Sequence, residues 1–120
     1  MRLYSFEKLN VWQKARELNK SIYLISNDFP KEEKFGLTSQ IRRASISISS
    51  NIAEGSSRKS SKEQARYTEI AYGSLLEVLS QLILANDLNY INKETITEIR
   101  LLIEEIGNKL NKLKEFQINR

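Results

Sequence analysis

The sequence predicts an all-α protein, an antiparallel up-down-up-down bundle of four helices in one domain that spans residues 1–120. Three observations carry this prediction. Apolar residues recur every three or four positions along four segments, which is the period of an amphipathic helix. Only 4 glycines and 1 proline are present, too few for the turns of a sheet protein. The connecting segments are short, and short connections place successive helices antiparallel.

The composition narrows the functional classes. Lysine and arginine (19) exceed aspartate and glutamate (15), and the net charge of +4 permits contact with polyanions without requiring it. The chain has no cysteine and no histidine, so it lacks disulfides, thiolate ligands and the most common general base. No nucleotide-binding glycine motif and no nucleophile elbow occur. We therefore expect no enzyme activity, no cofactor and no metal.

The first helix is expected over residues 10–27. Its core face consists of apolar residues three or four positions apart: Val11, Ala15, Leu18, Ile22 and Ile25. Asn10 is the expected N-cap, and Gln13 follows at the spacing of a capping box. Trp12 lies beside the core face and is interpreted either as an aromatic at the core edge or as an anchor between subunits.

The second helix is expected over residues 31–54, with Pro30 opening it and Gly55 ending it as the C′ residue. Its core face is Leu37, Ile41, Ala44, Ile48 and Ile52. Ile46 lies on the opposite side, so this helix is expected to meet a neighbour there as well. The many serines are weak helix formers, which indicates that packing rather than propensity holds this helix.

The third helix is expected over residues 61–86, capped by Ser60 or Ser61. It carries two apolar stripes. The first is Tyr67, Ala71, Ser74, Val78, Leu82 and Ala85, and the second is Tyr72, Leu76, Leu79 and Ile83. Together they are wider than one bundle can bury, and exposed stripes of this size mark association. We therefore expect a homo-oligomer, unless a loop or terminus covers the second stripe; the expected interface residues are Trp12, Ile46, Tyr72, Leu76, Leu79 and Ile83.

The fourth helix is expected over residues 92–116. It shows an almost heptad-like seam of Ile96, Ile99, Ile103, Ile106, Leu110 and Leu113. Its other faces are charged. We expect the chain after Phe116 to fray.

Two groups of polar residues are candidate functional sites. The first is a polar line on the second helix with possible partners on the third: Gln40, Arg43, Ser47, Asn51, Glu54, Ser74 and Glu77. It is interpreted as a network between helices or subunits, or as a ligand-facing groove. The second is a basic set for phosphate contacts, with Arg58, Lys59, Lys62 and Arg66 foremost and Arg42 and Arg43 next. Few aromatic residues alternate with these cations, so base stacking is not predicted.

Several runs of residues resemble one family. They are Leu9-x-Val11-Trp12-x-x-Ala15, and Phe35-Gly36-Leu37-x-x-Gln40-x-Arg42-Arg43-Ala44-x-x-Ser47-Ile48-x-x-Asn51-Ile52-Ala53-Glu54-Gly55. Ala71, Gly73, Ser74 and Glu77 extend the resemblance, which covers Phe6 to about Phe116. The family is the four helix bundle proteins, also called intervening-sequence proteins, whose genes were first noticed inside insertions in bacterial large-subunit ribosomal RNA genes. Ser49 departs from the pattern, because members often carry a proline there, so a kink in the second helix is less assured.

The resemblance implies an antiparallel bundle that assembles as a ring-shaped homopentamer. A similar protein, the accessory factor of diversity-generating retroelements, is a positively charged pentamer that engages nucleic acid and a reverse transcriptase. The family has no catalytic residues to carry over. The partners implied are therefore further copies of the chain, RNA or DNA, and a protein such as a reverse transcriptase.

Two functions follow from these patterns. The first is a homo-oligomer that binds RNA or DNA through its basic surface, and the second is a protein-protein adaptor whose charge only keeps it in solution. The sequence has no stretch of about 18 apolar residues that could span a membrane. We expect a cytoplasmic protein that does not associate with membranes.

Overall fold

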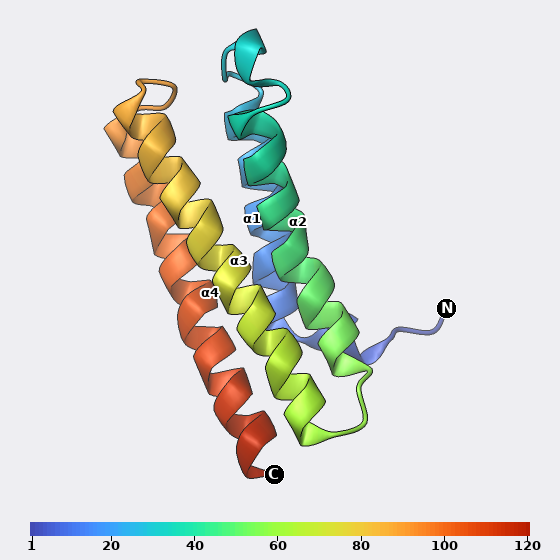
Figure 1. The fold of residues 1–120 in the computed structure, drawn as a ribbon. Coiled ribbons are helices and arrows are strands. Elements are labelled where there is room, and N and C mark those ends of the chain that lie inside the picture. Colours follow the sequence, from blue (N-terminus) through green and yellow to red (C-terminus); the bar gives the residue numbers. More distant parts are fainter.

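Four long helices make up most of the chain in the computed structural model, which describes residues 1–120 (Figure 1). They are α1 (Asn10–Ser26), α2 (Leu37–Ser56), α3 (Ser61–Asp87) and α4 (Lys93–Asn119). Two short 3-10 segments, η1 (Ser5–Lys8) and η2 (Lys31–Glu33), precede α1 and α2. The prediction of an all-α chain is confirmed.

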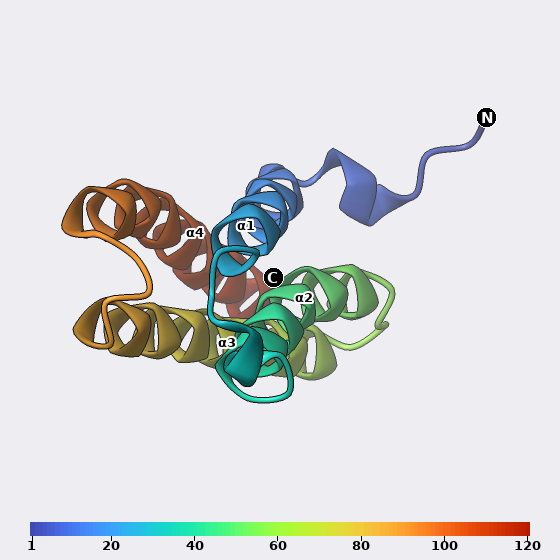
Figure 2. The same ribbon diagram turned by 90° about the horizontal axis from the view of Figure 1, so that it is seen from above.

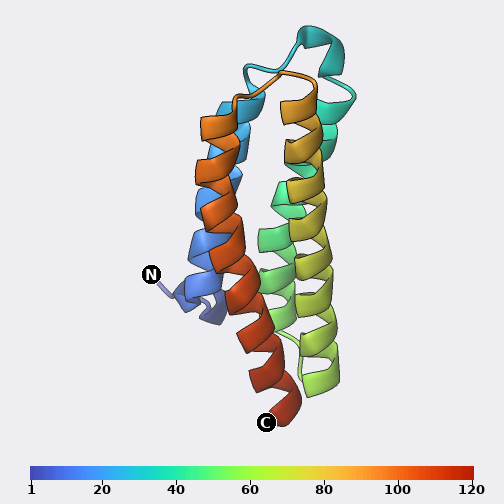
Figure 3. The same ribbon diagram turned by 90° about the vertical axis from the view of Figure 1, so that its left-hand side faces the viewer.

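The four helices pack side by side with antiparallel neighbours. Each helix contacts the next along the chain, and α4 returns to contact α1. Seen from above, α1 and α4 form one layer and α2 and α3 the other (Figure 2), and the view from the side shows the same two pairs (Figure 3). The prediction of four antiparallel helices in sequential contact is therefore confirmed.

The core lies between the two layers and consists of the apolar faces that the sequence indicated. Leu18, Ile22, Ile41, Ile48 and Leu82 are completely buried, and the seam of α4 from Ile96 to Leu110 completes the core. At the margins of the core Ile25, Leu37, Tyr67 and Leu113 are only partly buried.

Polar contacts explain why α2 carries so many serines. On the side facing α1, the Ser45 hydroxyl donates to Asn19 Oδ1 (2.6 Å), and Asn19 Nδ2 donates to Ser49 Oγ (2.8 Å). On the side facing α3, the hydroxyls of Ser47 and Ser74 lie 2.8 Å apart. Serine is small enough for close helix approach, and its hydroxyl satisfies polar groups at both contacts. The helix runs without interruption through Ser49.

The start of α2 differs from the expectation. Residues Lys31–Glu33 form only a 3-10 turn, and α2 begins at Leu37 instead of 31. Glu33 accounts for this, because its Oε1 accepts a hydrogen bond from the Leu37 backbone N–H (2.9 Å) and caps the helix from outside. A Cβ atom at Gly36 would lie 2.6 Å from that oxygen, so a larger residue there would require the Glu33 side chain to shift.

The ends of α1 and α2 also correct two details. Asn10 is the first residue of α1 rather than its N-cap, and the Gln13 side chain donates to the Glu7 carbonyl (2.8 Å) instead of completing a capping box. Gly55 lies inside α2 and is not a C′ residue. A Cβ there would lie 2.8 Å from Tyr67 Cβ, so this glycine permits close approach of α3.

The ends of α3 and α4 depend on side-chain caps and on tertiary contacts. Ser60 caps α3, as one of two expected residues, by accepting from the Glu63 N–H (3.1 Å). The last helix does not fray after Phe116 but continues to Asn119. Gln117 is the cause, because its Oε1 accepts a buried hydrogen bond from the Thr68 hydroxyl (2.7 Å) and ties this turn to α3.

Candidate nucleic-acid interface

Four exposed cations gather at the turn between α2 and α3. Arg58 and Lys59 lie in the turn, and Lys62 and Arg66 lie on the first turns of α3. None of the four takes part in a salt bridge. The turn lies at the end of the bundle where the chain also terminates (Figure 1). We refer to these four residues as the basic end.

Tyr67 brings two of these cations together. The Arg58 guanidinium donates to the Tyr67 hydroxyl (2.9 Å) and lies 4.8 Å from the ring centroid, while that of Arg66 lies 5.8 Å from the same centroid. The Gln64 amide donates to the Arg58 carbonyl (2.8 Å) and steadies the turn. Two guanidinium groups that share one ring and lack an acidic partner leave donors free for an anion.

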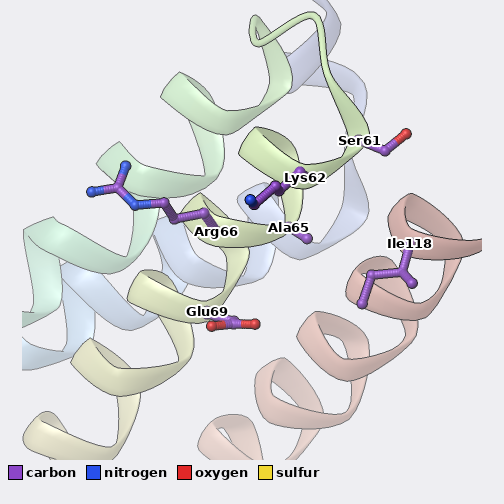
Figure 4. A pocket seen from close by; sticks show the side chains of 6 residues that line it. All are labelled: Ser61, Lys62, Ala65, Arg66, Glu69 and Ile118. Atoms are coloured by element: carbon purple, nitrogen blue, oxygen red, sulfur yellow. The ribbon is translucent and has the colours of Figure 1, made fainter.

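A hollow of about 520 Å³ lies next to the basic end, between the start of α3 and the end of α4. It is lined by Ser61, Lys62, Ala65, Arg66, Glu69 and Ile118, and Figure 4 shows Ile118 facing it from α4 while Arg66 extends away from that helix. Glu69 pairs with Lys114 (2.8 Å), and Arg120 Nε donates to Ser61 Oγ (3.2 Å). The one acidic side chain of the hollow is thus paired with a lysine, and the other charged side chains that line the hollow, Lys62 and Arg66, are cations.

Arg120 and Phe116 belong to this end of the molecule, although neither was a candidate from the sequence. The signal that could have located them is helix length. Because α3 and α4 both contain 27 residues and run antiparallel, the last turn of α4 must lie beside the first turn of α3.

The other two candidate cations lie elsewhere and have partners within the chain. Arg42 Nε donates to Ser26 Oγ (2.8 Å), and its guanidinium stacks 4.6 Å from the ring centroid of Tyr23. It therefore joins α2 to the end of α1. Arg43 forms a salt bridge with Glu77 (2.7 Å), and the structure does not bring either residue to the basic end.

The polar line on α2 divides into two groups and one isolated residue. The Arg43–Glu77 pair is flanked by two glutamines. The Arg43 guanidinium donates to Gln40 Oε1 (3.1 Å), and Gln81 Nε2 donates to Glu77 Oε2 (3.2 Å). Further along, Ser47 contacts Ser74 and accepts from Asn51 Nδ2 (3.0 Å). The Glu54 side chain makes no hydrogen bond or ion pair. Both groups join α2 to α3 within one chain.

The expected interface residues lie in three separate places. Trp12 packs edge-on against Phe6 of η1 (5.0 Å between centroids), a contact that the sequence did not indicate. Ile46 is exposed on the outer side of α2. The second stripe of α3 lies beside a hollow of about 290 Å³ next to α4, and within it Leu76 is 48% exposed and Ile83 38%.

Two titratable groups away from the basic end have shifted pKa values. A hydrogen bond to Glu17, assisted by the charge of Glu105, raises the pKa of Lys14 above its usual value. A hydrogen bond to Glu33 raises the pKa of Tyr90. The Lys14 shift arises mainly within α1 and the Tyr90 shift from a contact between two turns, and neither group adjoins the basic end.

Neither a metal centre nor a membrane-spanning segment is found. No group of three or more acidic side chains is arranged to hold a metal ion. No helix is long and apolar enough to cross a bilayer.

Fold and surface together define a four-helix protein with an unpaired basic end. The chain belongs to the 23S rRNA-intervening sequence protein family, whose model matches residues 7–112. This confirms the family resemblance, and the function of the family is unknown. A crystal structure of a protein with unknown function from the S23 ribosomal protein family of Bacteroides thetaiotaomicron is similar, with 25% sequence identity and a TM-score of 0.78. The match covers 87% of this chain and 97% of the other. No curated protein matches the chain.

Proposed function

We propose that the protein is a non-enzymatic, homo-oligomeric helical bundle that binds RNA or DNA through its basic end. The observation that carries this proposal is the set of exposed, unpaired cations Arg58, Lys59, Lys62 and Arg66 at one end of the bundle. Cations that contact phosphates release condensed counterions, which gives affinity without sequence preference. Arg42 and Arg43 have internal partners and are secondary in this proposal.

The second stripe of α3 supports the homo-oligomer. Leu76 and Ile83 remain exposed after the bundle has formed, and no loop or terminus covers them. Apolar stripes of this kind are typical of association surfaces. Assembly would place several basic ends on one particle, and the phosphate contacts of each copy would add to the affinity. A pentameric ring is implied by the family resemblance.

A charge-reversal experiment tests the proposal. The triple variant Arg58→Glu, Lys62→Glu, Arg66→Glu is compared with Lys20→Glu, Lys31→Glu, Lys93→Glu, which reverses three exposed, unpaired lysines and changes the net charge equally. We expect the first variant to lose binding to a panel of RNAs and DNAs at low ionic strength, and the second to retain most of it. The mass of the oligomer, measured by light scattering, should not change. Equal losses in both variants would show that net charge alone matters and would contradict a dedicated surface.

An adaptor function is the second candidate, and one observation favours it. Phe35 is 88% exposed on the turn between η2 and α2, at the end opposite the basic end, and Leu88 is exposed at the end of α3. Exposed aromatic residues are frequent anchors of protein interfaces. If this function is correct, reversing the charges of the basic end will change little, and the wild-type protein will not bind nucleic acid in a salt-dependent manner.

A further inference from the structure

Phe116 is an exposed aromatic side chain held in a fixed position. It is 66% exposed on the last turns of α4. The next residue, Gln117, is only 7% exposed and is hydrogen-bonded to Thr68 across the interface with α3. The backbone at Phe116 is therefore anchored, and the phenyl ring is presented to solvent by a helix rather than by a loose terminus.

Two cations are close to this ring along the chain. Lys112 lies one helical turn before Phe116 on the same face of α4, and Arg120 follows Asn119, the last residue of the helix. Arg120 also bonds to Ser61 at the start of α3. Phe116 and Arg120 share a hollow of about 190 Å³ with Gln64, the residue that donates to the Arg58 carbonyl. Gln64 therefore connects the hollow beside the ring to Arg58 of the basic end, and none of the four basic-end cations lines that hollow itself.

We infer that the basic end binds single-stranded nucleic acid, with Phe116 stacking on an unpaired base while Arg58, Lys62, Arg66 and Arg120 contact phosphates. The inference rests on the proposed function and deepens it. Aromatic side chains set among cations are the usual means of binding single strands without sequence preference, because every base has a stacking face. In a duplex the bases are already stacked on one another, so an exposed aromatic side chain gains little from them.

The surroundings favour an anionic occupant over a second protein surface. The centre of a protein interface is depleted of charged residues, whereas Arg120 shares the hollow beside Phe116 and Lys112 lies one helical turn before it on α4. The second stripe of α3, which is the apolar surface assigned to self-association, consists of other residues and adjoins a different hollow, lined by Tyr72, Leu76 and Leu79.

The test compares two phenylalanines at opposite ends of the bundle. Phe116→Ala and the control Phe35→Ala each remove an exposed ring, and Phe116→Trp restores a larger one. Binding is measured by fluorescence anisotropy to a single-stranded oligouridylate of about 20 nucleotides, longer than the site of a single-strand-binding domain, and to an RNA duplex of the same length. We expect Phe116→Ala to weaken single-strand binding about 5-fold or more and to leave duplex binding unchanged. Phe35→Ala should match the wild type, and Phe116→Trp should bind the single strand at least as well as the wild type.

The outcomes separate this inference from the proposed function. If the wild type binds neither RNA at low salt, the proposed function is wrong and the inference fails with it. If the wild type binds RNA but Phe116→Ala binds the single strand as the wild type does, only the inference is overturned. A change in the oligomer mass of Phe116→Ala, measured by light scattering, would assign the ring to contacts between copies and would also overturn the inference.

Discussion

At the scale of single residues, Glu33 shows how one side chain can define a helix end. Its Oε1 caps α2 through the Leu37 N–H, and its Oε2 accepts from the Tyr90 hydroxyl (3.0 Å) in the turn before α4. The Tyr90 ring packs against Phe29 with 5.7 Å between centroids. One carboxylate thus joins the start of α2 to the α3–α4 turn.

The hydrogen bond from Tyr90 to Glu33 predicts a pH dependence of stability. It raises the pKa of Tyr90 above 10.0, because ionisation would remove the donated proton. A group whose pKa is higher in the folded than in the unfolded state stabilises the fold fully below the unfolded pKa. That contribution disappears as the pH rises through the folded pKa.

Tyr90→Phe should therefore be less stable than the wild type at neutral pH, and the difference should vanish at strongly alkaline pH. Urea unfolding of both proteins from about pH 8 to pH 12 measures the difference in free energy of unfolding. A difference that does not vary with pH would show that the hydroxyl contributes through packing alone.

At the scale of elements, two buried glycines in helices have opposite roles. A Cβ at Gly55 would lie 2.8 Å from Tyr67 Cβ, which cannot move away without moving α3. A Cβ at Gly107 would lie 3.5 Å from Leu75 Cδ2 and 3.7 Å from Tyr72 Cε1, which is ordinary contact. Gly55 is thus required by packing, whereas Gly107 costs helix propensity without a steric need.

Alanine substitution should separate these two roles. Gly55→Ala is expected to destabilise the protein by about 1–3 kcal/mol through overpacking. Gly107→Ala is expected to stabilise it by up to about 1 kcal/mol, because alanine is the better helix former and its methyl group fits. Thermal or urea unfolding checks both values, and two changes of the same sign would contradict the steric distinction.

The elements also show which features follow from sequence and which need the fold. The apolar repeats predicted the four helices and their core faces because burial of one face has a local period. The predicted start of α2 was wrong, because Pro30 and Glu33 also suit the first turn of a helix. Only the folded chain shows that Glu33 caps α2 from outside the helix. The predicted end of α4 was wrong for a similar reason, since the hydrogen bond that holds Gln117 comes from Thr68 of another helix.

At the scale of the whole molecule, the basic end combines local and distant contributions. Arg58, Lys59, Lys62 and Arg66 are close in sequence, so one turn gathers them and the sequence could indicate them. Phe116 and Arg120 arrive from the far end of the chain through the antiparallel pairing of α3 and α4. The sequence could not show that Arg42, unlike the cations of the basic end, has partners within the chain, because its contacts with Ser26 and Tyr23 exist only in the folded bundle.

Self-association through the second stripe of α3 is testable on the same scale. Leu76→Glu with Ile83→Glu should dissociate the oligomer, because charges in an apolar interface lose their hydration without gaining partners. Leu24→Glu with Leu101→Glu changes two exposed leucines outside the stripe and should leave the assembly intact. Sedimentation velocity measures both masses. A wild-type protein that stays a folded single subunit, with the stripe exposed, would contradict the homo-oligomer.

The most direct test of phosphate binding by the basic end is the salt dependence of RNA affinity of the wild-type protein. Each phosphate contact on a single strand contributes about −0.7 to the slope of log affinity against log salt concentration. If all four cations of one subunit engage, we predict a slope of about −3 for each bound subunit, and a much smaller slope for the variant with Arg58, Lys62 and Arg66 reversed. RNA binding that is absent at low ionic strength, or that does not respond to salt, would contradict the proposed function.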